Sequence, residues 1–167
     1  VISSWNNELF VYESPLSPNN SYTATLTDPR FAVSSIGRGS GLSLGLQFGD
    51  INGDGTVDLL AGDQSADVSH YNNGAVFVFL GPFSGSRTAA DFTISGSRDG
   101  ERAGRDIVLP DIDGDGQLDL VMESTDTGTP HLFYGPLTGD LDTASSHASI
   151  QNTSYYVSAF LSPGDLN

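Results

Sequence analysis

Two nine-residue stretches decide the fold of this chain: Asp50-Ile51-Asn52-Gly53-Asp54-Gly55-Thr56-Val57-Asp58 and Asp111-Ile112-Asp113-Gly114-Asp115-Gly116-Gln117-Leu118-Asp119. Each places an oxygen-bearing side chain at positions 1, 3, 5 and 9 and a glycine at position 6. The glycine permits a sharp, left-handed bend that turns successive carboxylates inward. Two such loops predict sites for a hard cation, because Ca²⁺ prefers six to eight oxygen ligands at about 2.3–2.6 Å.

The surrounding residues argue against an EF-hand. That loop needs a bidentate Glu at position 12 and a helix on each side, whereas position 12 is Ala61 in the first loop and Met122 in the second. The flanks 46–48 and 59–61 are short apolar runs without helix caps. We therefore expect each loop to join two strands, with the ninth-position Asp completing the site. Without metal, the second loop would crowd four carboxylates together.

The chain also contains an internal repeat. Gly81-Pro82-Phe83-Ser84-Gly85 recurs as Gly135-Pro136-Leu137-Thr138-Gly139 and, more faintly, as Ser14-Pro15-Leu16-Ser17. A strand-like run precedes each copy (75–80, 131–134 and 9–12), and a further short strand is expected after each, around 91–94, 148–150 and 24–26. The predicted unit is strand, metal loop, strand, connection, strand, Gly-Pro turn, strand. Four short antiparallel strands in 54–61 residues are typical of a β-propeller blade.

These motifs resemble a known family. Residues 44–62 together with 74–81 resemble an FG-GAP repeat of the integrin α-subunit propeller type, and residues 103–123 with 131–135 resemble a second copy. The resemblance implies an all-β fold of antiparallel four-stranded blades, with the Asp-rich loop between the first two strands. The sequence departs from the family pattern at Asp63 and Glu123, where small residues are usual, and at Ala103, which replaces an aromatic residue.

The resemblance also implies the Ca²⁺ ligands, with the residue at position 7 contributing its backbone carbonyl. In the two complete loops they are Asp50, Asn52, Asp54, Thr56 and Asp58, then Asp111, Asp113, Asp115, Gln117 and Asp119. A third, incomplete loop is predicted at 164–167, where Asp165 and Asn167 match the first and third positions.

The ends of the sequence predict about three blades' worth of strands in one unit, 1–167. We expect a partial blade at 1–40, blades at 41–97 and 98–152, and at 153–167 the first strand and metal loop of a further blade. Two alternatives follow. The chain is a piece of a larger propeller, or copies complete one another head to tail, with the strand 155–161 joining the N-terminal strands of a neighbour. Such a contact gives a ring if it closes and a filament if it does not.

The charge balance narrows the choice of partners. There are 21 acidic residues against six Arg and no Lys, and seven of the acids belong to the two loops. The remaining acidic excess argues against nucleic acid or an anionic membrane as a partner.

Cysteine is absent, so we expect Ca²⁺ rather than disulfides to link the strands. We find neither a signal peptide nor a membrane span. An extracellular or cell-surface location is expected, where weak Ca²⁺ sites suffice.

The expected function is adhesion without catalysis, through protein or glycan contacts on the face away from the metal loops. The connections 31–40, 63–73, 98–102 and 125–130 would build that face. Two alternatives remain, a head-to-tail filament protomer and the non-catalytic propeller of a secreted hydrolase. Residues 41–45 match Gly-x-Ser-x-Gly, but no helix is expected after Ser43, so it is not expected to be a nucleophile.

The sequence also allows expectations for the histidines, for several aromatic residues and for two asparagines. We expect His70, His131 and His147 to be structural or solvated, because no partner stands near them in sequence. Aromatic residues are expected to pack between blades, with a sugar- or protein-binding patch as the alternative; they are Trp5, Tyr71, Tyr155 and Tyr156. Asn19 and Asn152 begin Asn-x-Ser/Thr sequences and are candidate glycosylation sites.

Overall fold

The computed structural model describes residues 2–5, 8–11, 31–34 and 45–150, and in the first three segments only the backbone. These residues are all-β apart from the short 3₁₀ helix η1 (Thr143–Ser145). The strands are β1 (Ile2–Trp5), β2 (Glu8–Val11), β3 (Phe31–Ser34), β4 (Leu46–Gly49), β5 (Asp58–Asp63), β6 (Ala75–Phe79), β7 (Gly85–Arg87), β8 (Phe92–Ser95), β9 (Ala103–Val108), β10 (Leu120–Ser124), β11 (Thr129–Phe133), β12 (Leu141–Asp142) and β13 (Ala148–Ser149).

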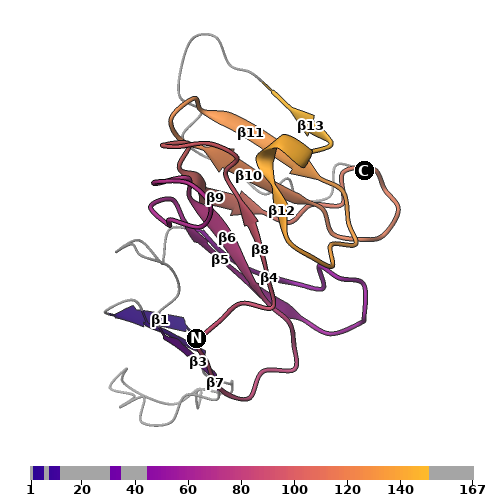
Figure 1. Ribbon diagram of the computed structural model, residues 1–167. Coiled ribbons are helices and arrows are strands. Elements are labelled where there is room, and N and C mark those ends of the chain that lie inside the picture. The colour runs from indigo at the N-terminus through magenta and orange to yellow at the C-terminus, as the bar shows by residue number, and fades with distance from the viewer. Residues whose placement is uncertain (1, 6–7, 12–30, 35–44, 151–167) are drawn as a thin grey trace, which may run out of the picture.

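The described strands form three sheets, which do not close into a ring (Figure 1). Their strand orders are β1-β2-β3-β7, β4-β5-β6-β8-β12 and β9-β10-β11-β13. Strands that follow one another within a repeat pair antiparallel. The second and third sheets therefore have the predicted order of strand, Asp-rich loop, strand, connection, strand, Gly-Pro turn, strand. This confirms the prediction of antiparallel blades of the β-propeller type.

Each of the first two sheets gains an edge strand from the following repeat. β7 pairs in parallel with β3, so that Phe31 stands opposite Gly85, and β12 pairs in parallel with β8, so that Ile94 stands opposite Leu141. Both added strands come just after a Gly-Pro turn. They protect the outer edge of the preceding sheet. The sequence did not predict them, because two or three residues carry no periodicity.

One prediction about the first sheet is wrong. We expected residues 31–40 to be a connection, but 31–34 form β3, which pairs with β2 in the fourth-strand position. The run Phe-Ala-Val-Ser contains an aromatic and a β-branched residue, both of which favour strands. The strand expected at 24–26 lies outside the described residues. The segments that would complete a blade in a head-to-tail filament also lie outside them, so that arrangement stays a prediction.

The second sheet is buried on both faces. β5 and β6 are buried along their whole length, which explains why 75–79 is a continuous apolar run rather than an alternating one. One face packs against the third sheet. Leu60, Val76 and Val78 of the second sheet contact the cluster formed with Ile107, Met122 and Phe133 of the third. The other face carries a second cluster formed by Leu59, Ala61, Ala66, Ala75, Phe77 and Phe79.

The backbones of the second and third sheets approach closely at glycines. A Cβ added to Gly62 would lie 1.9 Å from the carbonyl oxygen of Gly104, and one added to Gly104 would lie 2.5 Å from that of Ala75. Gly74 forms an isolated parallel bridge to Ala103 at the same junction. Any side chain at these positions would push the sheets apart, so the spacing of the two repeats depends on glycine.

This close approach predicts that Gly62→Ala destabilises the protein. Because the clash is with backbone rather than with a flexible side chain, the loss should reach about 1–3 kcal/mol, the usual cost of overpacking. Urea unfolding followed by circular dichroism measures it. Gly139→Ala is the matched control, because a Cβ there meets nothing within 4 Å. Equal stability of the two variants would contradict the packing described here.

Candidate metal centre

The two Asp-rich loops lie at the same end of their sheets. The first joins β4 to β5 and the second joins β9 to β10. The two Gly-Pro turns follow β6 and β11, and because neighbouring strands are antiparallel they return to this same end. Strands rather than helices flank both loops, which agrees with the exclusion of an EF-hand.

The first loop is curled by hydrogen bonds from its own backbone. The Asp50 carboxylate accepts from the N–H groups of Gly53 (2.8 Å) and Gly55 (2.7 Å) through its two oxygens. Asn52 Oδ1 accepts from the N–H of Asp54 at 3.0 Å. Both glycines have positive φ, 76° and 85°. The loop therefore wraps its N–H groups around the first carboxylate, and its curl is set by the chain itself.

The second loop has the same geometry. Asp111 accepts from the N–H groups of Gly114 (2.8 Å) and Gly116 (3.0 Å), and Asp113 accepts from that of Asp115 at 3.2 Å. The φ angles of the glycines are 78° and 86°. The sequence pattern predicts the need for glycine only at position 6. The structure shows that position 4 also needs glycine, since it too adopts a left-handed conformation.

Three carboxylates gather in the second loop. Oxygens of Asp111, Asp113 and Asp115 all lie within 4.8 Å of one another, and the three residues are exposed. Three negative charges at this separation repel one another unless a cation lies between them. Hard carboxylate oxygens are also the donors that Ca²⁺ prefers. The donor set therefore fits a calcium ion.

The first loop differs at position 3, where Asn52 replaces an acid. Its side-chain nitrogen donates to Asp54 Oδ2 at 2.9 Å. This bond and one from the N–H of Thr56 lower the pKa of the Asp54 carboxyl. Asp54 is therefore ionised at neutral pH. The first loop offers one fewer charge than the second but keeps an oxygen at every predicted side-chain position.

The ninth-position Asp connects the loop to the Gly-Pro turn. Asp58 accepts from the N–H groups of Ile51 (3.0 Å) and Gly81 (2.9 Å). Asp119 likewise accepts from Ile112 (2.7 Å) and Gly135 (2.9 Å). Both carboxylates are buried. Each one therefore fastens the start of its loop to the turn between the third and fourth strands of the repeat.

The glycine of each Gly-Pro turn is needed for this contact. A Cβ on Gly81 would lie 2.4 Å from the carbonyl oxygen of Val57, and a Cβ on Gly135 would lie 2.3 Å from that of Leu118. Val57 and Leu118 stand at position 8 of the loops. The recurrence of glycine here follows from the close approach of turn and loop.

Asp119 does not belong to the group of three carboxylates. Burial raises the pKa of Asp58, although the N–H bonds from Gly81 and Ile51 oppose the rise. That Asp58 and Asp119 also ligate the metal stays a prediction, as does the use of the Thr56 and Gln117 carbonyls. The other predicted site residues lie outside the described part of the chain; they are Asp165, Asn167, Asn19 and Asn152. Ser43, which is not expected to be a nucleophile, lies outside it as well.

The family comparison bears on these loops directly. The model of the FG-GAP-like repeat matches residues 50–122. Over these residues the chain is similar to an FG-GAP-like repeat. The match begins at the first residue of the first loop and ends within β10, so it includes both loops and confirms the resemblance seen in the sequence. No curated protein matches the chain significantly.

The two acidic departures from the FG-GAP pattern are both buried. Asp63 accepts from the N–H and the hydroxyl of Ser65 (2.9 and 2.8 Å), and Glu123 pairs with Arg105 at 3.3 Å. The second oxygen of each carboxylate has no hydrogen-bond partner among the described residues. Burial raises the pKa of Glu123, and the Arg105 charge opposes the rise.

A buried polar network joins the second and third sheets at the end opposite the loops. Glu101 accepts from Ser97 N–H (2.8 Å) and from the Ser124 hydroxyl (2.9 Å). His131 stands between Glu101, at 3.6 Å from its Nε2, and Ser146, at 3.4 Å from its Nδ1. His131 is therefore structural, as expected. The sequence could not show its partner, because Glu101 is thirty residues away.

The electrostatics of this network favour neutral His131 and ionised Glu101. Burial lowers the pKa of His131; Glu101 opposes this shift, Arg98 adds to it, and Asp126 opposes it. Burial alone would raise the pKa of Glu101, but hydrogen bonds from Thr143, Ser124 and Ser97 hold it below its ordinary value.

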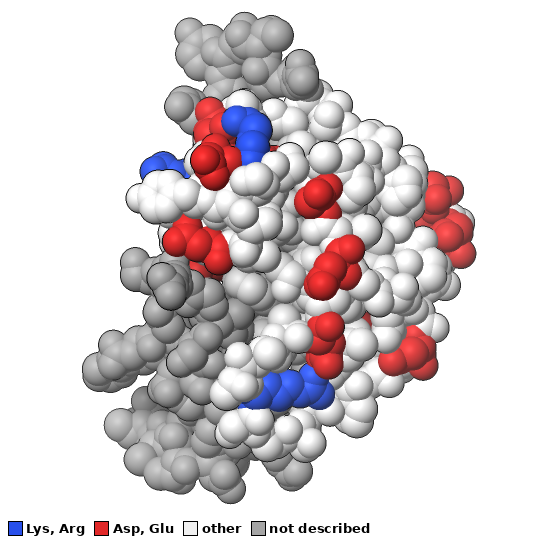
Figure 2. Space-filling view, in the orientation of Figure 1, with Lys and Arg blue, Asp and Glu red and all other residues white. Residues whose placement is uncertain are grey.

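The described surface carries few positive charges. Figure 2 shows acidic side chains spread over the visible face, with basic ones at only a few places. No helix in the described part of the chain is long and apolar enough to cross a membrane.

The lowered pKa of His131 predicts a pH effect on stability. The unfolded chain, with a His pKa near 6.5, binds a proton that the folded protein resists, so stability falls as the pH drops below about 6.5. His131→Gln removes this contribution. Wild type should therefore lose more unfolding free energy than the variant between pH 7 and pH 5.5, as measured by urea titration at each pH. Parallel losses in the two proteins would show that His131 does not titrate in this way.

Proposed function

We propose that this chain is an extracellular, calcium-binding FG-GAP module that acts in adhesion through protein or glycan contacts. Ca²⁺ has a structural role in the proposal. The cluster of Asp111, Asp113 and Asp115 carries it, together with the family match that includes both loops. Asp50, Asn52 and Asp54 would hold a second ion in the first loop. When bound, each ion neutralises the carboxylates of its loop.

The position of the loops supports a structural role for the metal. Each loop is tied through its ninth residue to the Gly-Pro turn of the same repeat. Fixing the loop therefore fixes the contact between the first two strands and the last two. Ligands that bind only the folded state raise its stability by mass action. External calcium is abundant enough for weak extracellular sites to be filled.

The opposite end of the sheets is available for partner contacts. The connections β5–β6, β8–β9 and β10–β11 meet there, and they include most of the residues predicted for this face. Thr129 and Pro130 belong instead to β11, and Asp63 to β5. Loops placed on a rigid sheet framework are the usual location of binding residues. This separation leaves one end for metal and the other for recognition.

Calcium should raise the melting temperature of the purified protein. At a concentration one hundred times the dissociation constant, one site adds about 2.7 kcal/mol to the free energy of unfolding. Excess chelator should reverse the rise. Replacing Asp111 and Asp113 together by Asn should remove most of the second loop's contribution, because the cation loses two of its charged ligands. Differential scanning calorimetry with and without Ca²⁺ makes the measurement.

The matched control is Asp106→Asn, which removes a carboxylate from β9 outside the loops. It should keep the full response to Ca²⁺. A melting temperature that Ca²⁺ does not change, or that it raises equally in the double loop variant, would contradict the structural role.

A further inference from the structure

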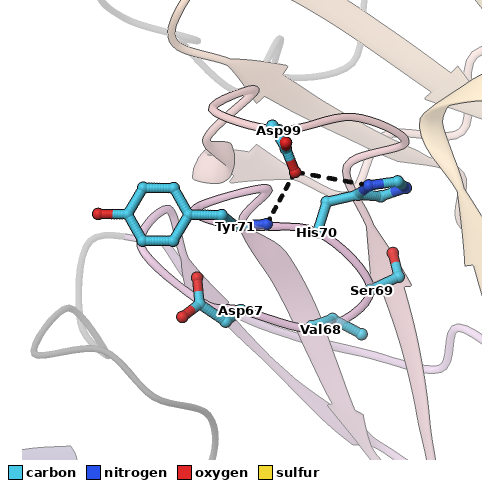
Figure 3. A pocket seen from close by; sticks show the side chains of 6 residues that line it. All are labelled: Asp67, Val68, Ser69, His70, Tyr71 and Asp99. Atoms are coloured by element: carbon cyan, nitrogen blue, oxygen red, sulfur yellow. Dashed lines mark hydrogen bonds and ion pairs between the residues drawn. The ribbon is translucent and has the colours of Figure 1, made fainter.

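The β5–β6 connection curls around an open hollow at the end of the sheet opposite the metal loops. Its volume is about 370 Å³, within the range of small-molecule sites. Five consecutive residues of the connection, 67–71, line it, and Asp99 from the β8–β9 connection completes the rim (Figure 3). The hollow therefore lies at the junction of two repeats, on the face assigned to partner contacts.

The frame of this hollow is held by buried hydrogen bonds. Asn73 is fully buried; its oxygen accepts from Val68 N–H at 3.0 Å, and its amide nitrogen donates to the Gly96 carbonyl at 2.7 Å and to the Ser69 hydroxyl at 3.2 Å. Asp67 accepts from the N–H of Asn72. The loop is therefore shaped before a ligand arrives, which reduces the entropy lost on binding.

Two of the polar side chains that line the hollow can only accept hydrogen bonds, and those of Ser69, His70 and Tyr71 can also donate them. Asp67 and Asp99 contribute carboxylates, and no Lys or Arg is among the lining residues. Asp99 Oδ1 accepts from Tyr71 N–H at 3.0 Å and faces His70 Nδ1 at 3.6 Å (Figure 3). Such a lining repels anions and favours a ligand that supplies several hydrogen-bond donors without negative charge.

Apolar surface is exposed beside these acceptors. Tyr71 is 70% exposed and Val68 47% exposed. The prediction that Tyr71 packs between blades is therefore wrong, because its ring projects from the rim of the connection instead (Figure 3). Exposed tyrosine combines a flat apolar ring with a polar end and is enriched where proteins bind partners.

We propose that this hollow binds a neutral saccharide. Tyr71 would stack against the C–H face of a sugar ring, while Asp67 and Asp99 would accept hydrogen bonds from its hydroxyl groups. A sugar matches the lining because it has an apolar face and a rim of hydroxyl donors. The inference rests on the proposed function and adds the class of ligand and the location of the binding site.

A cationic peptide is the competing ligand, and the geometry favours it less. The hollow is open to solvent, and the Asp99 side chain is 75% exposed. Ion pairs formed at such exposed positions contribute only about 0–1 kcal/mol. The lining also includes the Ser69 hydroxyl, which can hydrogen-bond to the hydroxyl groups of a sugar.

Saturation-transfer NMR on the calcium-loaded full chain tests the inference. The probes are glucose, galactose, mannose, fucose and N-acetylglucosamine, each added alone at millimolar concentration. At least one should receive saturation from the protein. Tyr71→Ala should weaken its binding about tenfold, the equivalent of one aromatic contact, and Asp99→Asn should weaken it as well. Tyr71→Phe keeps the ring and should keep the binding.

Ile150→Ala is the matched control, because Ile150 is 71% exposed but lies outside the hollow. The Ile150→Ala variant should bind the sugar as tightly as wild type does. Adding 0.5 M NaCl should leave the affinity unchanged, because the sugar carries no charge. Three results would overturn the inference: no response from any sugar, an equal response in Tyr71→Ala, or salt-sensitive binding of triarginine that depends on Tyr71. The melting-temperature response to Ca²⁺ remains a separate reading, so failure here does not count against the metal sites.

Discussion

The buried carboxylate at position 9 of each Asp-rich loop is the contact on which each repeat depends. Asp58 and Asp119 each accept one hydrogen bond from the second residue of the loop and one from the glycine of the Gly-Pro turn. These bonds are charge-assisted, and such bonds are stronger than those between neutral groups. One side chain therefore joins two turns that belong to different strand pairs.

The two ends of the sheets differ in chemistry. At one end, the loops and Gly-Pro turns are drawn together, and the exposed carboxylates of the second loop converge. At the other end, connections of varied sequence surround the Glu101–His131 network and the hollow beside Tyr71. The repeats are further joined by β7 and β12, which add to the sheet of the preceding repeat. The end with the loops therefore has the same structure in both repeats, whereas the connections at the other end differ between them.

The sequence predicts the features that repeat within short spans. The Asp-rich loops, the Gly-Pro turns and the strands beside them follow from patterns of nine residues or fewer, and the structure contains all of them in the described range. That each Asp-rich loop joins two strands is also predicted, because position 12 lacks the Glu of an EF-hand and the flanks are short apolar runs. The place of the loop between the first two strands of a blade is what the FG-GAP resemblance implies.

Other features depend on contacts between distant residues. Glu101 meets His131 across the junction of two sheets. β7 and β12 are too short to show a pattern and form only because the preceding sheet offers an open edge. The exposure of Tyr71 depends on how its connection curls around Asn73. The role of Asp58 and Asp119 was anticipated only as that of metal ligands, because their partners Gly81 and Gly135 lie 16 to 23 residues away.

The ninth-position Asp is expected to stabilise the repeat even without metal, and urea unfolding in excess chelator measures this contribution. Asp119→Ala leaves two N–H groups without their acceptor, so it should lose at least about 2 kcal/mol of unfolding free energy. Asp113→Ala, in the same loop, removes an exposed carboxylate from a crowded group and should change stability by no more than about 0.5 kcal/mol. Equal effects of the two substitutions, or an Asp119→Ala variant as stable as wild type, would show that the ninth-position Asp does not stabilise the repeat.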